Sequence, residues 1–195
     1  MINSVCVFCG SSMGTKASYS TAARDLGVEL AHHHIALVYG GGSVGLMGLM
    51  ADSVLKHGGK VTGIIPQTLV QREVEHSHLS ELHVVETMHQ RKAMMAELSD
   101  AFVTMPGGFG TYEELFEVIS WAQLGIHSKP ILLLNIDGYF DLLIQMIEHS
   151  VAEGFIRQQD ADLVRVTSRV ETVIPMLQES PRQDFRPKYM DIDKT

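Results

Sequence analysis

The chain has 195 residues, of which 45% are apolar and 19% are charged, and its formal net charge is −8. This length suits one domain with a substantial core and is short for two. The acidic balance, without a basic stripe, argues against broad contact with nucleic acid or an anionic membrane, and no apolar run reaches the roughly 18 residues of a membrane span.

The first residues, Met1-Ile2-Asn3-Ser4, lack the basic region of a signal peptide, so we expect a cytoplasmic protein. The apolar segment Val5–Cys9 that follows is a predicted buried strand. It carries Cys6 and Cys9 in a C-x-x-C pattern, which can mark a redox pair. We favour a structural role, because odd spacing in a strand points the two thiols to opposite faces.

Short, continuously apolar runs alternate with helical patterns along most of the chain. Continuous hydrophobicity is typical of strands that are buried on both faces. The predicted strands are Val5–Cys9, Ile35–Tyr39, Val61–Ile65, His83–Glu86, Ala101–Met105, Ile131–Asn135 and Leu163–Val166. The predicted helices are Ser18–His33, Val44–His57, Thr87–Ser99, Thr111–Leu124, Tyr139–Glu153 and Val170–Glu179. This alternation predicts an α/β fold: a Rossmann-like three-layer sandwich with a central parallel sheet of about seven strands and helices on both faces.

Ligands of such sheets bind at the carboxyl ends of the strands, so the turns that follow the strands are where a site is expected. Four of these turns are polar or rich in glycine: 10–12, 40–43, 66–68 and 106–111. We expect pocket-lining residues in the first two turns, together with one on a later helix. These candidates are Gly10, Ser11, Gly41, Gly42, Ser43 and Met88.

The turn after the second strand matches the dinucleotide fingerprint, as Gly40-x-Gly42-x-x-Gly45. That motif also requires an acidic residue at the end of the next strand, to bind a ribose hydroxyl. The next strand ends in Ile65-Pro66-Gln67-Thr68, without an acid, so a bound NAD is disfavoured. The glycines then serve a tight turn or allow a ligand to approach the backbone closely.

The predicted helix 87–99 carries an arginine on its apolar side. At 3.6 residues per turn, Arg91 shares a face with Met88, Met94, Met95 and Leu98, which are expected to face the core. A guanidinium is costly there unless an anion pairs with it. The partner is either a carboxylate of the chain in a structural salt bridge, or a substrate phosphate or catalytic carboxylate, which we favour.

The turn Pro106–Thr111 is the strongest candidate site, because it joins a buried strand to a helix. The free N–H groups and the dipole at a helix N-terminus attract anions, and three glycines remove side chains that would block a phosphate. The turn lacks the Gly-Lys-Ser/Thr of a P-loop, so we do not expect a triphosphate with magnesium. Glu114 has two interpretations, since Thr111-x-x-Glu114 is also the pattern of a capping box.

Two motifs together resemble the Lonely-Guy (LOG) family, whose members were often labelled "possible lysine decarboxylase". They are Met88-His89-Gln90-Arg91-Lys92 and Pro106-Gly107-Gly108-Phe109-Gly110-Thr111-Tyr112-Glu113-Glu114. The resemblance runs from Cys6 to about Gly154 and includes the stretches 39–48 and 121–127. It implies a homodimer that hydrolyses the N-glycosidic bond of cytokinin riboside 5′-monophosphates, and in several bacterial relatives AMP, to free base and ribose 5-phosphate. It implies no cofactor and no metal.

The resemblance also implies roles for individual residues. Arg91 and Glu114 correspond to the catalytic pair of the family. The implied substrate contacts are Glu73, Arg91, Lys92, Gly107, Gly108, Phe109, Gly110, Thr111, Tyr112, Glu113, Glu114 and Ser120. Phe109 is commonly tyrosine and Ser120 is commonly threonine in the family. The alternative function is a nucleotide-binding or sensor domain that does not cleave its ligand.

No repeat or linker divides the chain, so we expect residues 1–180 to form a single nucleotide-binding domain. The segment 181–195 is polar and contains proline, and is predicted to be a C-terminal tail.

Overall fold

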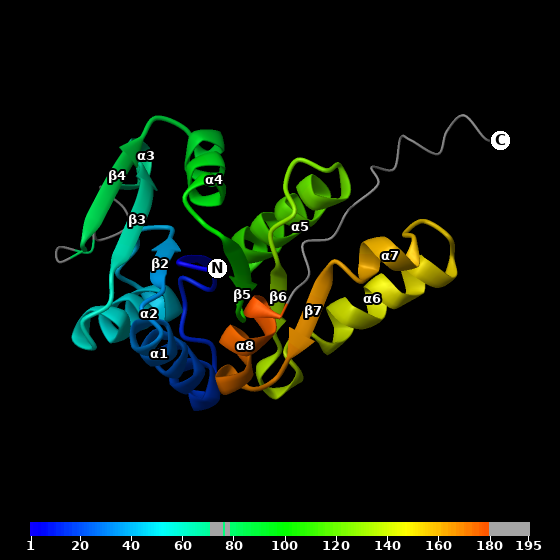
Figure 1. Ribbon diagram of the computed structural model, residues 1–195, viewed down its shortest axis with the longest axis horizontal. Helices are drawn as coiled ribbons and strands as arrows, with labels where there is room; N and C mark the ends of the chain where they lie inside the picture. The colour runs from blue at the N-terminus through cyan, green and yellow to red at the C-terminus, as the bar shows by residue number, and fades with distance from the viewer. Residues whose placement is uncertain (71–75, 77–78, 180–195) are drawn as a thin grey trace.

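The computed structural model describes residues 1–70, 76 and 79–179 of the chain, so the predicted tail and Glu73 lie outside the described residues (Figure 1). Its centre is a seven-stranded sheet in the order β4-β3-β2-β1-β5-β6-β7. Every neighbouring pair of strands is parallel. The parallel α/β fold predicted from the sequence is therefore confirmed.

The strands lie within two residues of their predicted positions. They are β1 (Ser4–Phe8), β2 (Ala36–Tyr39), β3 (Val61–Pro66), β4 (Glu81–Val85), β5 (Ala101–Thr104), β6 (Ile131–Leu134) and β7 (Val164–Thr167). All residues of β5 and β6 are buried, as the continuous hydrophobicity of these runs predicted.

The six predicted helices are present, although their ends differ. They are α1 (Ala17–His32), α2 (Gly45–Lys56), α4 (Met88–Glu97), α5 (Phe109–Gln123), α6 (Asp141–Ala152) and α8 (Val173–Gln178). Short helices α3 (Gln67–Val70) and α7 (Gln158–Ala161), with 3-10 turns η1 (Ile136–Gly138) and η2 (Val170–Thr172), complete the described elements. No helix among the described residues is long and apolar enough to cross a bilayer.

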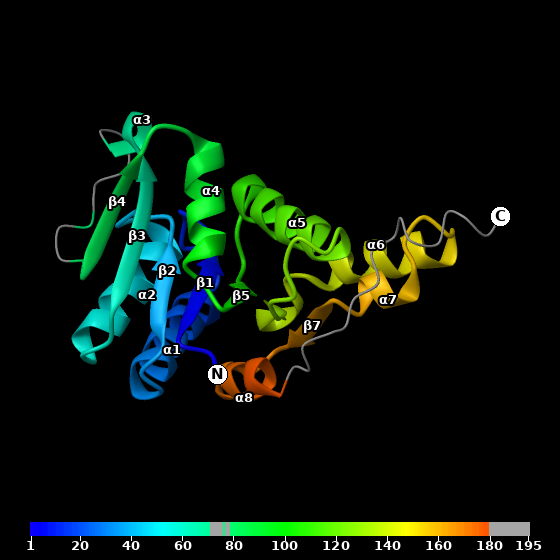
Figure 2. The same ribbon diagram turned by 45° about the horizontal axis from the view of Figure 1, so that its top comes forward.

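The sheet separates two apolar layers (Figure 2). On one side, α1, α2 and α8 pack on the sheet through residues such as Leu26, Met50 and Leu177. On the other side, α4, α5 and α6 cover it. Cys6 belongs to the second layer and Cys9 to the first, so the two thiols face opposite sides, as predicted. Burial raises the pKa of both thiols, which makes neither a reactive thiolate.

The order of the strands reverses at β1, which lies between β2 and β5. The turns that follow β1 and β5 therefore meet at the carboxyl edge of the sheet, at a topological switch point. A hydrogen bond of 3.0 Å from the Gly10 N–H to the Pro106 carbonyl joins the two turns. This is the place where an open α/β sheet binds a ligand.

Candidate active site at the switch point

A cavity of ≈ 260 Å³ lies at the switch point. Gly10 and Ser11 line it from the turn after β1, Gly107 and Gly108 from the turn after β5, and Tyr139 from the far side. Other candidates for its wall lie elsewhere: Gly41 and Gly42 are buried at the end of β2 and Ser43 is half-buried beside them.

The start of α5 differs from its predicted position. The helix begins at Phe109 with Gly108 as its N-cap, and no side chain of the described residues caps it. Glu114 therefore lies in the second turn of the helix, and the capping-box interpretation of Thr111 and Glu114 is wrong. Because no side chain occupies the cap, the first N–H groups of α5 stay available to an anion.

The side chains of the turn and the first helical turn point in different directions. Gly108 and Gly110 are exposed, and a Cβ on either would meet nothing within 4 Å. Phe109 is 93% exposed, so its ring does not pack against the turn. Thr111 is buried against Gly107, where a Cβ would come within 2.1 Å of the Thr111 Oγ1. The turn thus offers open backbone to a ligand.

Arg91 is buried on α4. Its Nη2 donates to the Gly40 carbonyl at 3.1 Å and its Nη1 to the Met88 sulfur at 3.8 Å. Its Nε is buried and has no hydrogen-bond partner among the described residues. The predicted apolar face is only partly correct: Met95 is buried with Arg91, whereas Met88 and Leu98 are each 41% exposed. These two lie toward the ends of a ten-residue helix, beyond the part that packs on the sheet.

Gly40 has a role that the dinucleotide fingerprint did not suggest. A Cβ at this position would lie 1.8 Å from the Arg91 Nη2. Glycine is therefore required here because the guanidinium approaches the backbone closely. Gly45, the last glycine of the pattern, has a φ of +63° at the start of α2, as a tight turn requires.

Glu114 occupies an unusual environment for a carboxyl group. Burial raises its pKa from 4.5 to about 7, and the nearby Arg91 guanidinium opposes this increase. Glu113 and Glu117 raise the pKa further and Lys92 lowers it. A carboxyl group that titrates near neutral pH beside a buried arginine is typical of a catalytic site.

Lys92 connects the two helices that carry Arg91 and Glu114. Its ammonium donates to Glu113 and, at 2.9 Å, to Glu117 Oε1. Burial disfavours the charged ammonium, but the hydrogen bonds to these glutamates raise the pKa of Lys92 overall. Lys92 follows Arg91 and Glu113 precedes Glu114 in the sequence, and these two neighbours thus bind each other.

Of the other residues that the resemblance implies, Ser120 lies apart from this group. Ser120 is exposed and donates to the Phe116 carbonyl at 2.7 Å. It follows Glu114 by six positions, about 9 Å along the axis and on a different face of α5. Glu73 lies outside the described residues. Tyr139, in contrast, lines the cavity but could not be predicted from the sequence, because its partner is a backbone carbonyl far along the chain.

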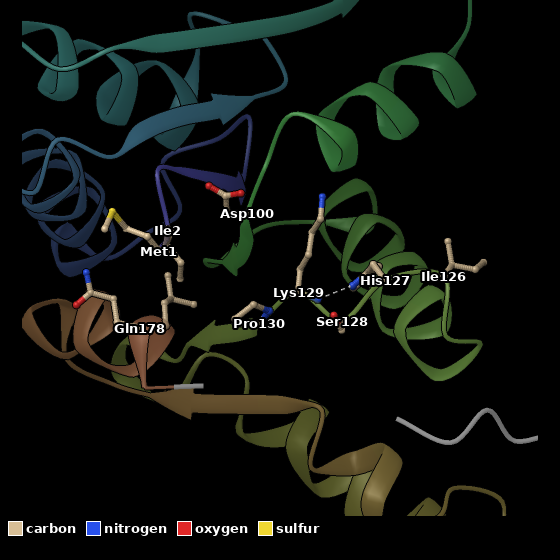
Figure 3. Close-up of a pocket in the computed structure, with 10 residues that line it drawn as sticks. Met1, Ile2, Asp100, Ile126, His127, Ser128, Lys129, Pro130 and Gln178 are labelled. Carbon is tan, nitrogen blue, oxygen red and sulfur yellow. Dashed lines mark hydrogen bonds between the residues drawn. The ribbon is translucent and has the colours of Figure 1, made fainter. Parts of the chain in front are cut away.

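A second cavity, of ≈ 500 Å³, lies at the opposite edge of the sheet, where Ile2, Asp100 and Pro130 precede β1, β5 and β6 (Figure 3). Its polar side chains support the fold. The two ring nitrogens of His127 contact the Val118 carbonyl and the Lys129 N–H, and Lys129 Nζ donates to the Ala96 carbonyl. These hydrogen bonds hold the segment 127–129 against α5 and α4.

The chain is similar to known proteins over most of its length. The family profile described as "Possible lysine decarboxylase" matches residues 47–177. Cytokinin riboside 5′-monophosphate phosphoribohydrolase LOG3 of Arabidopsis thaliana is 52% identical over 175 residues, which cover 90% of this chain and 81% of the relative. The probable phosphoribohydrolase LOGL2 of Oryza sativa subsp. japonica is 52% identical over 181 residues, covering 92% and 74%. The chain belongs to the LOG family.

Solved structures with lower identity share the fold of this LOG-family chain. The molybdenum cofactor carrier protein of Chlamydomonas reinhardtii has a TM-score of 0.71 at 20% identity, covering 92% of this chain and 98% of the carrier. The molybdenum cofactor binding protein of Rippkaea orientalis has a TM-score of 0.70 at 22% identity, covering 91% and 96%. At this identity the likeness concerns the fold alone. Within this fold, the two LOG motifs meet where α4 and α5 approach each other.

Proposed function

We propose that this chain hydrolyses the N-glycosidic bond of cytokinin riboside 5′-monophosphates, and also of AMP, to free base and ribose 5-phosphate. The half-buried Glu114 carboxyl near Arg91, in the second turn of the helix that follows the open glycine turn, is the observation that carries the proposal. The names of the curated relatives give the substrate class. A domain that only binds a nucleotide would not need a carboxyl group held near neutral pKa at this position.

In the proposed reaction, the N-terminus of α5 binds the 5′-phosphate and thereby places the ribose against Glu114. The C–N bond to the base weakens first, which leaves positive charge on the anomeric carbon and the ring oxygen. The Glu114 carboxylate stabilises this charge and orients a water molecule. The water oxygen bonds to the anomeric carbon and gives up one proton, and the departing base takes up one proton, so the two products together contain the atoms of the nucleotide and one water molecule.

Arg91 has two parts in this scheme. Its charge favours the ionised form of Glu114 and opposes the effect of burial. Its Nε, which has no partner in the described part of the chain, supplies a hydrogen-bond donor for an oxygen of the sugar or phosphate. Because the carboxylate is the active form, kcat/KM should increase with pH through a value of about 7.

The test is to incubate the purified chain with AMP and with isopentenyladenosine 5′-monophosphate and to quantify free base and ribose 5-phosphate. We expect both products in equal amounts, and about a 100-fold or greater loss of kcat in Glu114→Gln. Glu97→Gln removes one exposed carboxylate at the end of α4 and serves as the matched control. Intact nucleotides after incubation with folded protein would instead support the alternative of a binding or sensor domain.

We also propose that the protein is a homodimer joined along α5. Phe109 and Phe116 lie seven residues apart, hence on one face of the helix, and are 93% and 37% exposed. Ser120 follows on the same stripe and is exposed too. A second copy packed on this stripe would cover both rings and would bring Ser120 toward the site of that copy, which accounts for its distance from its own glycine turn.

A further inference from the structure

Tyr139 contacts the glycine turn, although it lies outside the two LOG motifs in the sequence. It follows η1, and its ring packs edge-on against Tyr19 and Phe140, with ring centroids 5.7 Å and 4.9 Å away. These contacts fix the ring in the wall of the cavity at the switch point. From there its hydroxyl donates a hydrogen bond to the Gly107 carbonyl.

The Gly107 carbonyl belongs to the same peptide unit as the Gly108 N–H. In a planar trans peptide the C=O and the N–H point in opposite directions. Because the Tyr139 hydroxyl binds the Gly107 carbonyl, the Gly108 N–H points away from Tyr139. Glycine flanks this peptide on both sides, so its own steric preferences restrict the rotation of the peptide plane very little. The orientation of the N–H must come from a contact such as that of Tyr139.

A second hydroxyl supports the first. The Tyr112 hydroxyl donates to the Tyr139 hydroxyl at 3.2 Å, and this hydrogen bond together with burial raises the pKa of Tyr112 to about 12, which keeps it a donor. The chain of hydrogen bonds thus runs from α5 through Tyr139 to the turn that precedes the same helix. Donors linked in this way strengthen one another.

We propose that Tyr139 is a positioning residue, supported by Tyr112, that orients the Gly107–Gly108 peptide so that its N–H binds the phosphate of the ligand. The class of the ligand, a sugar 5′-phosphate, rests on the proposed function. Tyr139 itself does not contact the reacting atoms. Its removal therefore affects the affinity for the phosphate group and leaves the recognition of the base intact.

The experiment compares ligands that differ only in the phosphate. AMP and adenosine are titrated calorimetrically into chains that carry Glu114→Gln, with and without Tyr139→Phe, and ribose 5-phosphate is titrated into chains with Glu114 intact. Tyr139→Phe keeps the ring contacts and deletes the hydroxyl. We expect about a tenfold increase in Kd for AMP and ribose 5-phosphate and unchanged affinity for adenosine. In catalysis, KM for AMP increases while kcat changes less than twofold. Tyr112→Phe gives a smaller change of the same kind.

Ser53→Ala is the matched control, because it deletes another buried hydroxyl that links two elements through a carbonyl, that of Arg24 at 2.7 Å. It should lower the melting temperature about as much as Tyr139→Phe and leave every Kd unchanged. Unchanged affinity of Tyr139→Phe for AMP and ribose 5-phosphate, or an equal loss for adenosine, would overturn the proposal. A chain that binds these phosphates but hydrolyses no nucleotide would refute the proposed function and leave the role of Tyr139 to be decided by the same titrations.

Discussion

At the scale of single residues, the environment of Glu114 links activity to stability. Its pKa is raised from 4.5 in the unfolded chain to about 7 in the folded one. Between these values the folded state holds a proton that the unfolded state has released, so the free energy of unfolding decreases as the pH rises. The carboxyl group that the reaction needs in its ionised form is thus a cost to the fold under the conditions in which it works.

This linkage predicts that Glu114→Gln is more stable than the unaltered chain at alkaline pH. The difference in the free energy of unfolding between the two should grow by roughly 2–3 kcal/mol from pH 5 to pH 8, because the amide carries no charge to bury. Urea unfolding at several pH values measures it. A difference that stays constant with pH would show that Glu114 has an ordinary pKa.

Gly40 gives a second prediction at this scale. In Gly40→Ala the new methyl group would meet the Arg91 Nη2, so the guanidinium must move and the hydrolysis rate should fall at least tenfold. In a chain that already carries Arg91→Ala, the same substitution should cost almost no further activity. This non-additivity, measured as a double-mutant cycle on kcat/KM, separates the effect on Arg91 from general damage to the turn. Additive losses would contradict it.

At the scale of elements, the contact between α4 and α5 determines how the two motifs face each other. Lys92 on α4 binds Glu113 and Glu117 on α5. The groups around Glu114 also include Arg91 on α4, Cys6 on β1 and Cys9 directly after β1. The cation and the two carboxylates act on Glu114 in opposite directions. The bridge therefore both aligns the helices and adjusts the titration of the catalytic carboxyl group.

Substitutions in this bridge should move the pH profile in opposite directions. Lys92→Met removes a charge that lowers the pKa of Glu114, so the increase of kcat/KM with pH should occur above about 7. Glu117→Gln removes a charge that raises it, so the increase should occur at lower pH. Lys92→Met should also destabilise the fold by about 1 kcal/mol, since two glutamates lose their partner. Shifts in the same direction would show that the bridge acts through geometry alone.

At the scale of the whole molecule, the exposed stripe of α5 predicts the oligomeric state. Phe116→Lys places a charge in the middle of the stripe and should convert a dimer into a species with the 21.6 kDa mass of one chain. Leu142→Lys on α6, where the side chain is 79% exposed, is the control and should leave the dimer intact. Light scattering after size-exclusion chromatography measures both. A monomeric mass for the unaltered chain would contradict the proposed dimer.

Much of this architecture could be predicted from the sequence because both faces of the sheet are covered. Runs such as Ile131–Leu134 are then apolar throughout and easy to recognise. The first turn of α5 was missed because its cap, Gly108, contributes no side chain and thus no sequence signal. The partners of Lys92 and Tyr139 could not be predicted either. One pair of helices must pack before Lys92 meets its glutamates, and the Tyr139 hydroxyl binds a backbone carbonyl, which any residue would supply.

The central position of β1 has a consequence for the synthesis of the chain. β1 leaves the ribosome well before one of its two neighbours, β5, which begins only at Ala101. At a synthesis rate of ~5–20 residues per second, β5 emerges on the order of several seconds after β2. Until then, one edge of β1 has no partner strand. During that interval the nascent chain presents the unpaired backbone of an apolar strand, the kind of edge that recruits other chains. Synthesis from the N-terminus thus leaves β1, the central strand beside the site, prone to aggregation until the second half of the sheet emerges.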